Sequence, residues 1–305
     1  MSQEELTALI LGSDGEIGGA LATALEDSGA SVITTSKKLD PNNPNLKRLD
    51  LEHPQRFQLN QKVDVAYMCA GMTKLAECQA QPGLSWEVNV KSQIRLIREL
   101  YAQGTFIVYF SSHLIFDGTI AHVKPDHRQR PHCRFAEQKV AVEEHLSKLD
   151  CGYSVIRLSN ALGPRSPLLC KWANALQNGE SIEAINDMFI APVATDQIVQ
   201  AAILIGKERK EGVYQLSGDT DVPFDRVAVE LAEQLGVSSS LVRSVPADDA
   251  SWDIVARPEN TTLDTSRARR ELDFRPLAWS EVLGHFVEAN RLRSEMPYSS
   301  IADET

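Results

Sequence analysis

The chain has 305 residues, of which 43% are apolar and 24% charged, so it can bury a full core and disorder is not its default state. Its formal net charge of −11 argues against a nucleic-acid-binding surface, because such binding depends on basic side chains that displace counterions from phosphates. An acidic N-terminus followed by only a short apolar run predicts neither a secretory signal nor a membrane span, and we expect a cytoplasmic protein.

The five cysteines are scattered along the chain and form no CxxC pair. An odd number of widely spaced cysteines is typical of reduced thiols and argues against a metal cluster. The histidines show no HxxH or HExxH spacing either. We therefore expect no bound metal.

The first half of the chain alternates short apolar runs with helical patterns, which is typical of consecutive βαβ units. Strands are expected at residues 6–11, 31–35, 46–49, 63–69, 105–110 and 153–158, and helices at 85–103 and 135–149. This alternation predicts an α/β fold with a doubly wound parallel Rossmann sheet.

After a Pro/Gly-rich turn at 163–167 the pattern loosens, and the expected elements are helices at 168–178, 195–205, 224–236, 266–272 and 279–290 and strands near Ile182 and at 212–216. The strand at 212–216 would return to the main sheet. We therefore predict a dinucleotide-binding domain over 1–160, with 193–217 returning to it. A smaller C-terminal α/β lobe over 161–192 and 218–305 would bind substrate.

Three glycines directly after the first expected strand form a GxxGxxG arrangement. The first permits a tight turn, the second lets backbone amides approach a pyrophosphate, and the third lets the following helix pack closely on the sheet. Because the loop lies between a strand and a helix, it predicts a dinucleotide site. The cofactor-binding residues expected in it are Gly12, Asp14, Gly15, Glu16, Ile17 and Gly18.

The second strand ends in Ser36, Lys37 and Lys38, without the carboxylate that an NAD-preferring site offers to the ribose 2′-hydroxyl. A basic residue at this place can hold a 2′-phosphate. Ser36 and Lys37 are therefore candidate cofactor residues, and NADP is favoured, with NAD as the alternative. Paired surface lysines that are merely solvated would give the same pattern.

Four segments carry a family resemblance: MCAGMT at 68–73, FSSHLIFDG at 110–118, RLSNALGP at 157–164 and RPENTTLD at 257–264. Together they resemble the extended short-chain dehydrogenase/reductases, in particular the dTDP-4-dehydrorhamnose reductases and their sugar-nucleotide relatives. The resemblance implies an NAD(P)-dependent oxidoreductase or epimerase that acts on a sugar nucleotide or a similar anionic substrate. It further implies cofactor contacts at Asp50, Leu51, Cys69, Ala70 and Gly71.

The same resemblance places Ser112 where a hydroxyl orients the substrate carbonyl. We expect Asn160 and Phe135 beside the substrate. Basic residues of the C-terminal half would hold its phosphates, and the candidates are Arg165, Arg243 and Arg257. Surface salt bridges would explain each of these arginines equally well.

One position departs from the family, in which a tyrosine four residues before a lysine moves the proton. Here the pair is Phe135 and Lys139, so Lys139 can still bind the nicotinamide ribose but the phenyl ring has no proton to give. Because a positioned acid contributes roughly 10²- to 10⁴-fold, a substitute is needed. His113 and His132 are candidates, although each would also fit as an ordinary loop histidine.

The missing hydroxyl leaves two hypotheses open. The first is an enzyme in which a histidine replaces the tyrosine. The second is a catalytically degenerate protein that keeps the dinucleotide and serves as a regulatory or scaffold subunit. Either could form a homodimer, since the long helical patterns leave room for an interface.

Overall fold

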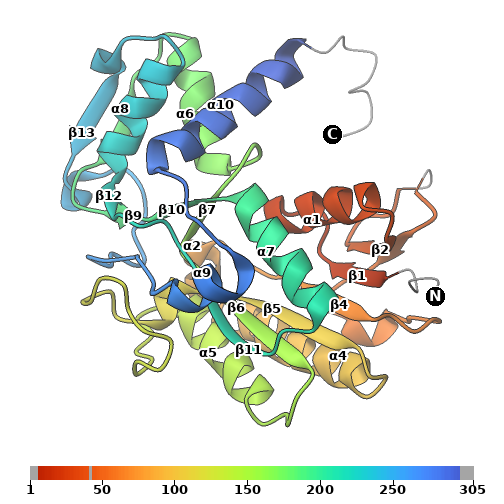
Figure 1. The fold of residues 1–305 in the computed structure, drawn as a ribbon. Helices are drawn as coiled ribbons and strands as arrows, with labels where there is room; N and C mark the ends of the chain where they lie inside the picture. The colour runs from red at the N-terminus through yellow and green to blue at the C-terminus, as the bar shows by residue number, and fades with distance from the viewer. Residues whose placement is uncertain (1–5, 41–42, 296–305) are drawn as a thin grey trace.

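The centre of the fold is a seven-stranded parallel sheet, and the computed structural model describes residues 6–40 and 43–295 (Figure 1). The strand order is β11-β6-β5-β4-β1-β2-β3. The winding reverses between β1 and β4, and ligands of such sheets bind beyond the carboxyl ends of the strands at this switch point. The strands are β1 (Thr7–Leu11), β2 (Ser31–Ser36), β3 (Leu46–Arg48), β4 (Val65–Met68), β5 (Phe106–Ser112), β6 (Tyr153–Leu158) and β11 (Gly212–Leu216).

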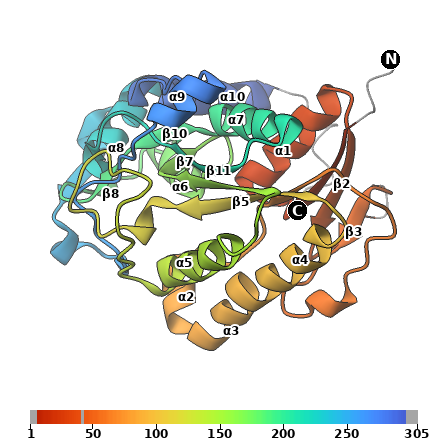
Figure 2. The ribbon, with the colours of Figure 1, turned by 60° about the horizontal axis from the view of Figure 1, so that its bottom comes forward.

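Helices cover both faces of this sheet, which explains why its central strands are apolar on both sides. On one face, α1 (Glu16–Asp27) and α7 (Thr195–Glu208) share a core cluster with the sheet. On the other face, α4 (Ser92–Tyr101) and α5 (Arg134–Leu146) form a second cluster. Figure 2 shows the two layers on either side of the strands. The predicted doubly wound Rossmann fold is confirmed.

The helix expected over 85–103 is present, but it begins at Pro82 and is not α-helical throughout. It consists of α3 (Pro82–Trp86), a π-helical turn over Glu87–Lys91 and α4, and a short helix α2 (Leu75–Ala80) precedes it. Single π turns inside helices are often found at functional sites. The apolar pattern did not reveal this one, because Val88 and Val90 within the turn are as buried as they would be in an α-helix.

The C-terminal part of the chain builds a smaller lobe with its own core, centred on Trp172, Leu231 and Phe286. Its elements are α6 (Pro167–Gln177), β8 (Ile182–Ile185), α8 (Phe224–Gln234), β13 (Val242–Val245) and α10 (Trp279–Glu295), with the short strands β7 (Asn160–Leu162), β9 (Phe189–Ile190), β10 (Pro192–Ala194) and β12 (Val222–Pro223). One helix expected in the lobe, α9 (Ser266–Leu272), packs against β11, and Ala268 belongs to the core of the main sheet. The remaining domain limits stay a prediction.

The end of β5 bears directly on the site. Strand β5 runs to Ser112, two residues beyond the expected end, so Ser112 is its last residue.

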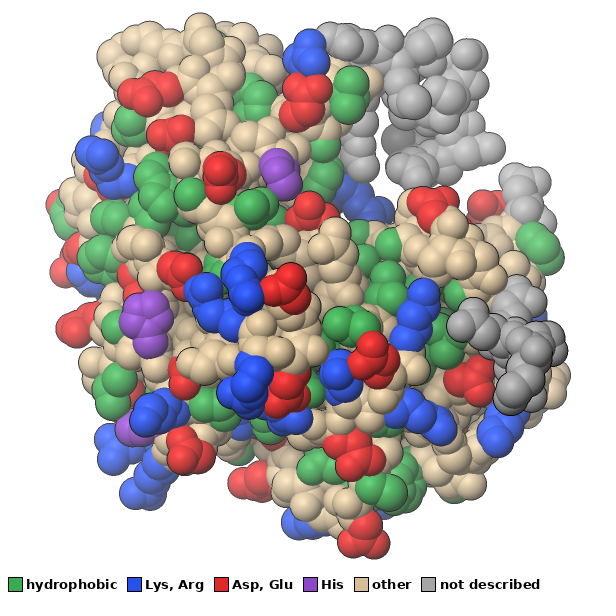
Figure 3. Space-filling model, in the orientation of Figure 1, with side chains coloured by type: hydrophobic (Ala, Val, Ile, Leu, Met, Phe, Trp, Pro, Cys, Tyr) green, Lys and Arg blue, Asp and Glu red, His purple; other side chains and the backbone are tan. Residues whose placement is uncertain are grey.

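Among the described helices, none combines the length and the apolarity needed to cross a membrane. Acidic and basic side chains lie side by side over much of the face in Figure 3, as the frequent ion pairs of the chain would produce.

Candidate functional site

The glycine loop joins β1 to α1 and forms a cradle of backbone atoms. Gly12 has a φ of +90°, and a Cβ added there would come within 2.6 Å of the backbone of Ala70. A Cβ on Gly18 would overlap the carbonyl oxygen of Gly12. No side chain caps the N-terminus of α1 at Gly15, so its first amides and its positive dipole end are available to an anion. The loop therefore fits a dinucleotide pyrophosphate.

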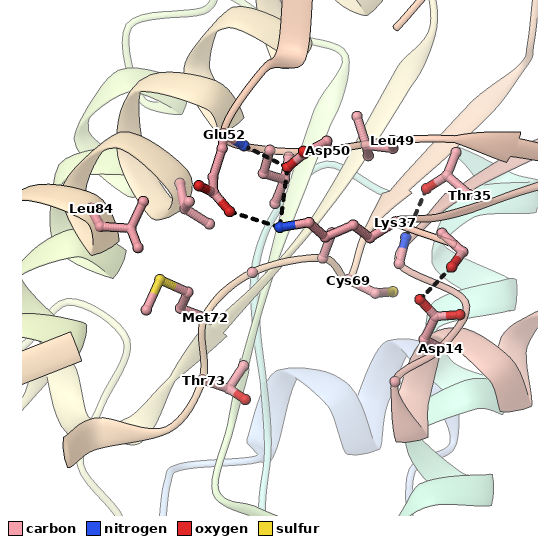
Figure 4. A pocket seen from close by; sticks show the side chains of 17 residues that line it. Asp14, Thr35, Lys37, Leu49, Asp50, Glu52, Cys69, Met72, Thr73 and Leu84 are labelled. Atoms are coloured by element: carbon pink, nitrogen blue, oxygen red, sulfur yellow. Dashed lines mark hydrogen bonds and ion pairs between the residues drawn. The ribbon is translucent and has the colours of Figure 1, made fainter. Parts of the chain in front are cut away.

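A pocket of about 340 Å³ opens beside this loop at the carboxyl ends of β1, β2 and β4 (Figure 4). The structure brings most of the expected cofactor residues together on its wall, namely Gly12, Asp14, Gly15, Ser36, Lys37, Asp50, Leu51, Cys69, Ala70 and Gly71. Sequence reasoning missed the other lining residues, which are Thr35, Leu49, Glu52, Met72, Thr73, Leu84 and Val88. The only signal that could have indicated them is their position in the sequence close to residues that were expected to bind the cofactor.

Two side chains at the end of β2, those of Ser36 and Lys37, make polar contacts beside this pocket. The ammonium of Lys37 lies between two carboxylates, 2.7 Å from Glu52 Oε1 and 3.6 Å from Asp50 Oδ1. Ser36 Oγ donates a hydrogen bond of 2.7 Å to Asp14 Oδ2. Figure 4 shows both contacts at the edge of the cavity. Carboxylates therefore do lie near the end of β2, but they come from the glycine loop and from the segment after β3.

Glu16, Ile17 and Gly18 do not line the pocket, because they lie in the first turn of α1. The Glu16 carboxylate instead accepts a hydrogen bond of 2.7 Å from the backbone N–H of Arg165. The guanidinium of Arg165 donates to the carbonyl oxygen of Gly15 at 3.0 Å and lies directly over Gly19. The structure thus places Arg165, expected beside the substrate, against the outside of the phosphate loop.

Lys139 reaches the backbone of β5 close to its carboxyl end, where Ser112 is the last residue of the strand. Lys139 Nζ donates a hydrogen bond of 2.7 Å to the carbonyl oxygen of Phe110, two residues before Ser112. Ser112 Oγ accepts the N–H of Leu114 at 3.2 Å, which leaves its own O–H free to donate. The ring of Phe135 lies one helical turn from Lys139, with its centroid 5.4 Å from Nζ. Burial lowers the pKa of Lys139 to about 8.

The two expected proton donors lie in different surroundings. His113 is 9% exposed, and its Nδ1 is 3.3 Å from the carbonyl oxygen of Leu158. Burial lowers the pKa of His113 to about 4, so its imidazole is neutral at physiological pH. His132 is exposed, in the loop that precedes α5. His113 is therefore not an imidazolium acid at physiological pH.

A buried amide network that the sequence did not indicate supports the wall between the pocket and α5. Asn89, in the π turn, binds both backbone groups of Met72 at 2.8 Å and donates to Gln138 Oε1 at 2.8 Å. Gln138 then donates to Ser85 Oγ at 2.8 Å. Because the side-chain amides of Asn89 and Gln138 are hydrogen-bonded to each other and to both neighbouring segments, the network fixes the loop after β4 relative to the helix that carries Lys139.

The remaining substrate candidates are dispersed. Asn160 lies in β7, and its buried Oδ1 has no hydrogen-bond partner among the described residues, so this acceptor is unsatisfied. The guanidinium of Arg257 is engaged by Asp187 and Asp248, and that of Arg243 by Glu183. The structure does not bring these two arginines to the pocket beside the glycine loop.

The segment RPENTTLD makes structural contacts along its length. The backbone N–H of Asn260 donates to the carbonyl oxygen of Gly118 at 2.9 Å, and Thr262 Oγ1 accepts the N–H of His122 at 3.0 Å. The carboxylate of Asp221 accepts hydrogen bonds from Thr261 and Thr262. These bonds tie the loop after β5 to the segment after β11.

The described residues show no cluster of histidine, cysteine and carboxylate groups that could hold a metal ion.

Comparison with known proteins identifies relatives over nearly the whole chain. A dTDP-4-dehydrorhamnose reductase from Aggregatibacter actinomycetemcomitans is 22% identical and aligns with 90% of this chain and 96% of its own length. The methionine adenosyltransferase 2 subunit beta of Xenopus laevis is 23% identical over 86% of this chain and 81% of its own. The crystal structure of dTDP-4-dehydrorhamnose reductase from Bacillus anthracis in complex with NADP superposes with a TM-score of 0.83 at 18% identity, covering 93% and 99% of the two chains.

A family model settles the assignment that these distant relatives suggest. The model described as "RmlD substrate binding domain" matches residues 6–292, which includes the glycine loop, the pair Phe135 and Lys139, and the segment RPENTTLD. The chain therefore belongs to the RmlD substrate binding domain family.

Proposed function

We propose that the protein is an NAD(P)-dependent oxidoreductase that reduces or oxidises a carbonyl or hydroxyl carbon of a sugar nucleotide. The proposal is carried by three features at the carboxyl ends of neighbouring strands: an uncapped α1 N-terminus, a pocket along the ends of β1, β2 and β4, and Ser112 at the end of β5, with Lys139 bound to the carbonyl oxygen of Phe110. A binding protein would need the first two features. Chemistry at a carbonyl needs the third.

The residues have separate tasks in this proposal. The first amides of α1 and the turn at Gly12 would hold the pyrophosphate, and Lys37 at the mouth of the pocket would favour NADP, with NAD as the alternative. When bound, the reduced dinucleotide supplies a hydride. Ser112 donates its free O–H to the substrate carbonyl oxygen, and Asn160 Oδ1 offers an acceptor to a sugar hydroxyl. The similar reductases, which act on a nucleotide-linked sugar by name, support this substrate class.

Two measurements test the proposal. Calorimetry with NADPH and NADH should show binding of at least one of them, and Gly15→Leu, which fills the space above the loop, should abolish it. A spectroscopic assay of nicotinamide oxidation with a panel of 4-keto sugar nucleotides should then show turnover. The proposal fails if neither dinucleotide binds, or if the native chain turns over no member of the panel, whether or not Phe135→Tyr does so.

A second candidate function is that of a non-catalytic subunit of another enzyme. Phe135 favours it, because the ring lacks the hydroxyl that the family uses, and so does the similarity to proteins named as a subunit beta. This candidate predicts dinucleotide binding without turnover in the native chain. Turnover by the native chain would exclude it.

A further inference from the structure

The ammonium of Lys139 has an unusual set of neighbours for a group whose task is only to hold a ribose. Its Nζ lies 4.7 Å from the ring centroid of Tyr109 and 5.4 Å from that of Phe135. Its hydrogen bond goes to the carbonyl oxygen of Phe110. Within residues 6–40 and 43–295, no other acceptor and no ion-paired carboxylate holds it. Two of its three N–H bonds therefore remain available to a ligand.

The charged and titratable groups around Lys139 come from four elements. Glu143 lies one turn further along α5, Cys69 follows β4, Cys78 is in α2, and Tyr109 is in β5. Glu143 is itself paired with Arg157 at 2.7 Å, with both side chains almost fully buried, so most of its charge is compensated. The removal of Lys139 from water outweighs these neighbours and lowers its pKa to about 8. An ammonium group with this pKa can give up and regain a proton near neutral pH.

The alternative donors in this region are less suitable. His113 is held at the carbonyl oxygen of Leu158 and is neutral at physiological pH, so it has no acidic imidazolium proton. His132 is exposed in the loop before α5. Lys139, in contrast, contacts the face of the Phe135 ring, which occupies the position where the family carries its acid.

We propose that Lys139 itself donates the proton to the substrate carbonyl oxygen, in place of the hydroxyl that Phe135 lacks. This inference rests on the proposed function. In the reductive direction, the hydride from the dinucleotide forms a C–H bond at the carbonyl carbon, and the electron pair of the C=O π bond moves to oxygen. One Nζ–H bond of Lys139 breaks as the O–H bond forms. The carbonyl is reduced, the dinucleotide is oxidised, and the neutral amine regains a proton from water.

The test compares Lys139→Arg in two backgrounds, the native chain and Phe135→Tyr. Arginine keeps the positive charge and can donate hydrogen bonds to a ribose, but its pKa above 12 prevents proton release. In the native background we expect the single-turnover reduction rate to fall by about 10²-fold or more, with KM and the calorimetric Kd for NADPH nearly unchanged. In the Phe135→Tyr background the tyrosine supplies the proton, and the loss should stay below about tenfold. Lys148→Arg, exposed just after α5, is the matched control and should change nothing.

A pH profile provides a measurement that needs no variant. The native reduction rate should fall as the pH rises through about 8, because the amine then loses the proton that it must donate. A flat profile in this region overturns the proposal, as does an equal loss from Lys139→Arg in both backgrounds. Both of these results leave the proposed function standing, because the native chain still turns over. Absence of turnover by the native chain overturns the role of Lys139 together with the proposed function.

Discussion

Replacement of His113 by asparagine gives a quantitative test of the environment at the end of β5. The imidazole is 9% exposed, and burial lowers its pKa from 6.5 to about 4. A group with a depressed folded-state pKa contributes stability that is fully present above the unfolded pKa of 6.5 and is lost as the pH falls toward 4. Linkage over this interval gives about 2 kcal/mol lost between pH 7.5 and pH 5, and about 3 kcal/mol once the pH is below 4.

The assay is urea unfolding of the native chain and of His113→Asn at pH 7.5 and pH 5. Asparagine places a non-titrating donor near the position of Nδ1, so the contact with Leu158 can persist. Carboxylates that titrate in this range do so in both proteins, so their contributions to the free energy of unfolding cancel in the difference between the two. We expect the free energy of unfolding of the native chain, relative to the variant, to fall by about 2 kcal/mol at the lower pH. A difference that stays constant would show that the imidazole is not held neutral, and would restore His113 as a candidate acid.

Three further predictions concern other parts of the structure. Gly18→Ala should lower the free energy of unfolding by about 1–3 kcal/mol in urea titrations, because its Cβ overlaps a carbonyl of the turn, whereas Gly15→Ala, with only ordinary contacts, should not. Arg157→Met leaves the buried carboxylate of Glu143 unpaired and should cost about 3–5 kcal/mol in the same assay, while an unchanged midpoint would contradict the ion pair. Lys37→Met should weaken NADPH binding about tenfold in calorimetry, with NADH as the internal control, and equal effects on both would argue against a 2′-phosphate contact.

The sheet and the phosphate loop could be predicted because local signals specify them. The strand expected at 153–158 matches β6 residue for residue. Ser154 and Arg157 interrupt its apolar run, but all of its residues after Tyr153 are buried. The GxxGxxG spacing likewise located the cradle, because backbone overlap at Gly12 and Gly18 leaves glycine as the residue that fits.

The parts that could not be predicted depend on contacts between distant segments. Asn89 lies within an apolar helical pattern, and its importance arises from Met72 and Gln138, 17 and 49 residues away. The sequence directly after β2 contains no carboxylate. The carboxylate that contacts Ser36 belongs to Asp14, 22 residues earlier in the chain. Composition and spacing cannot show which loop supplies a side chain to a shared edge of the sheet.

The structure changes which arginine is expected to attract a phosphate group. Arg257 and Arg243 were expected to hold substrate phosphates, yet each is already paired with carboxylates of the lobe. An arginine in this state must exchange one partner for another, and for exposed pairs the cost is small because water screens both charges. Arg165 differs from them, since it is bound to the phosphate loop through Gly15 and Glu16. Its guanidinium adds positive charge at the N-terminus of α1 and offsets the carboxylate of Glu16 in the same turn, so in this acidic chain the backbone amides of the loop remain the main attraction for a phosphate.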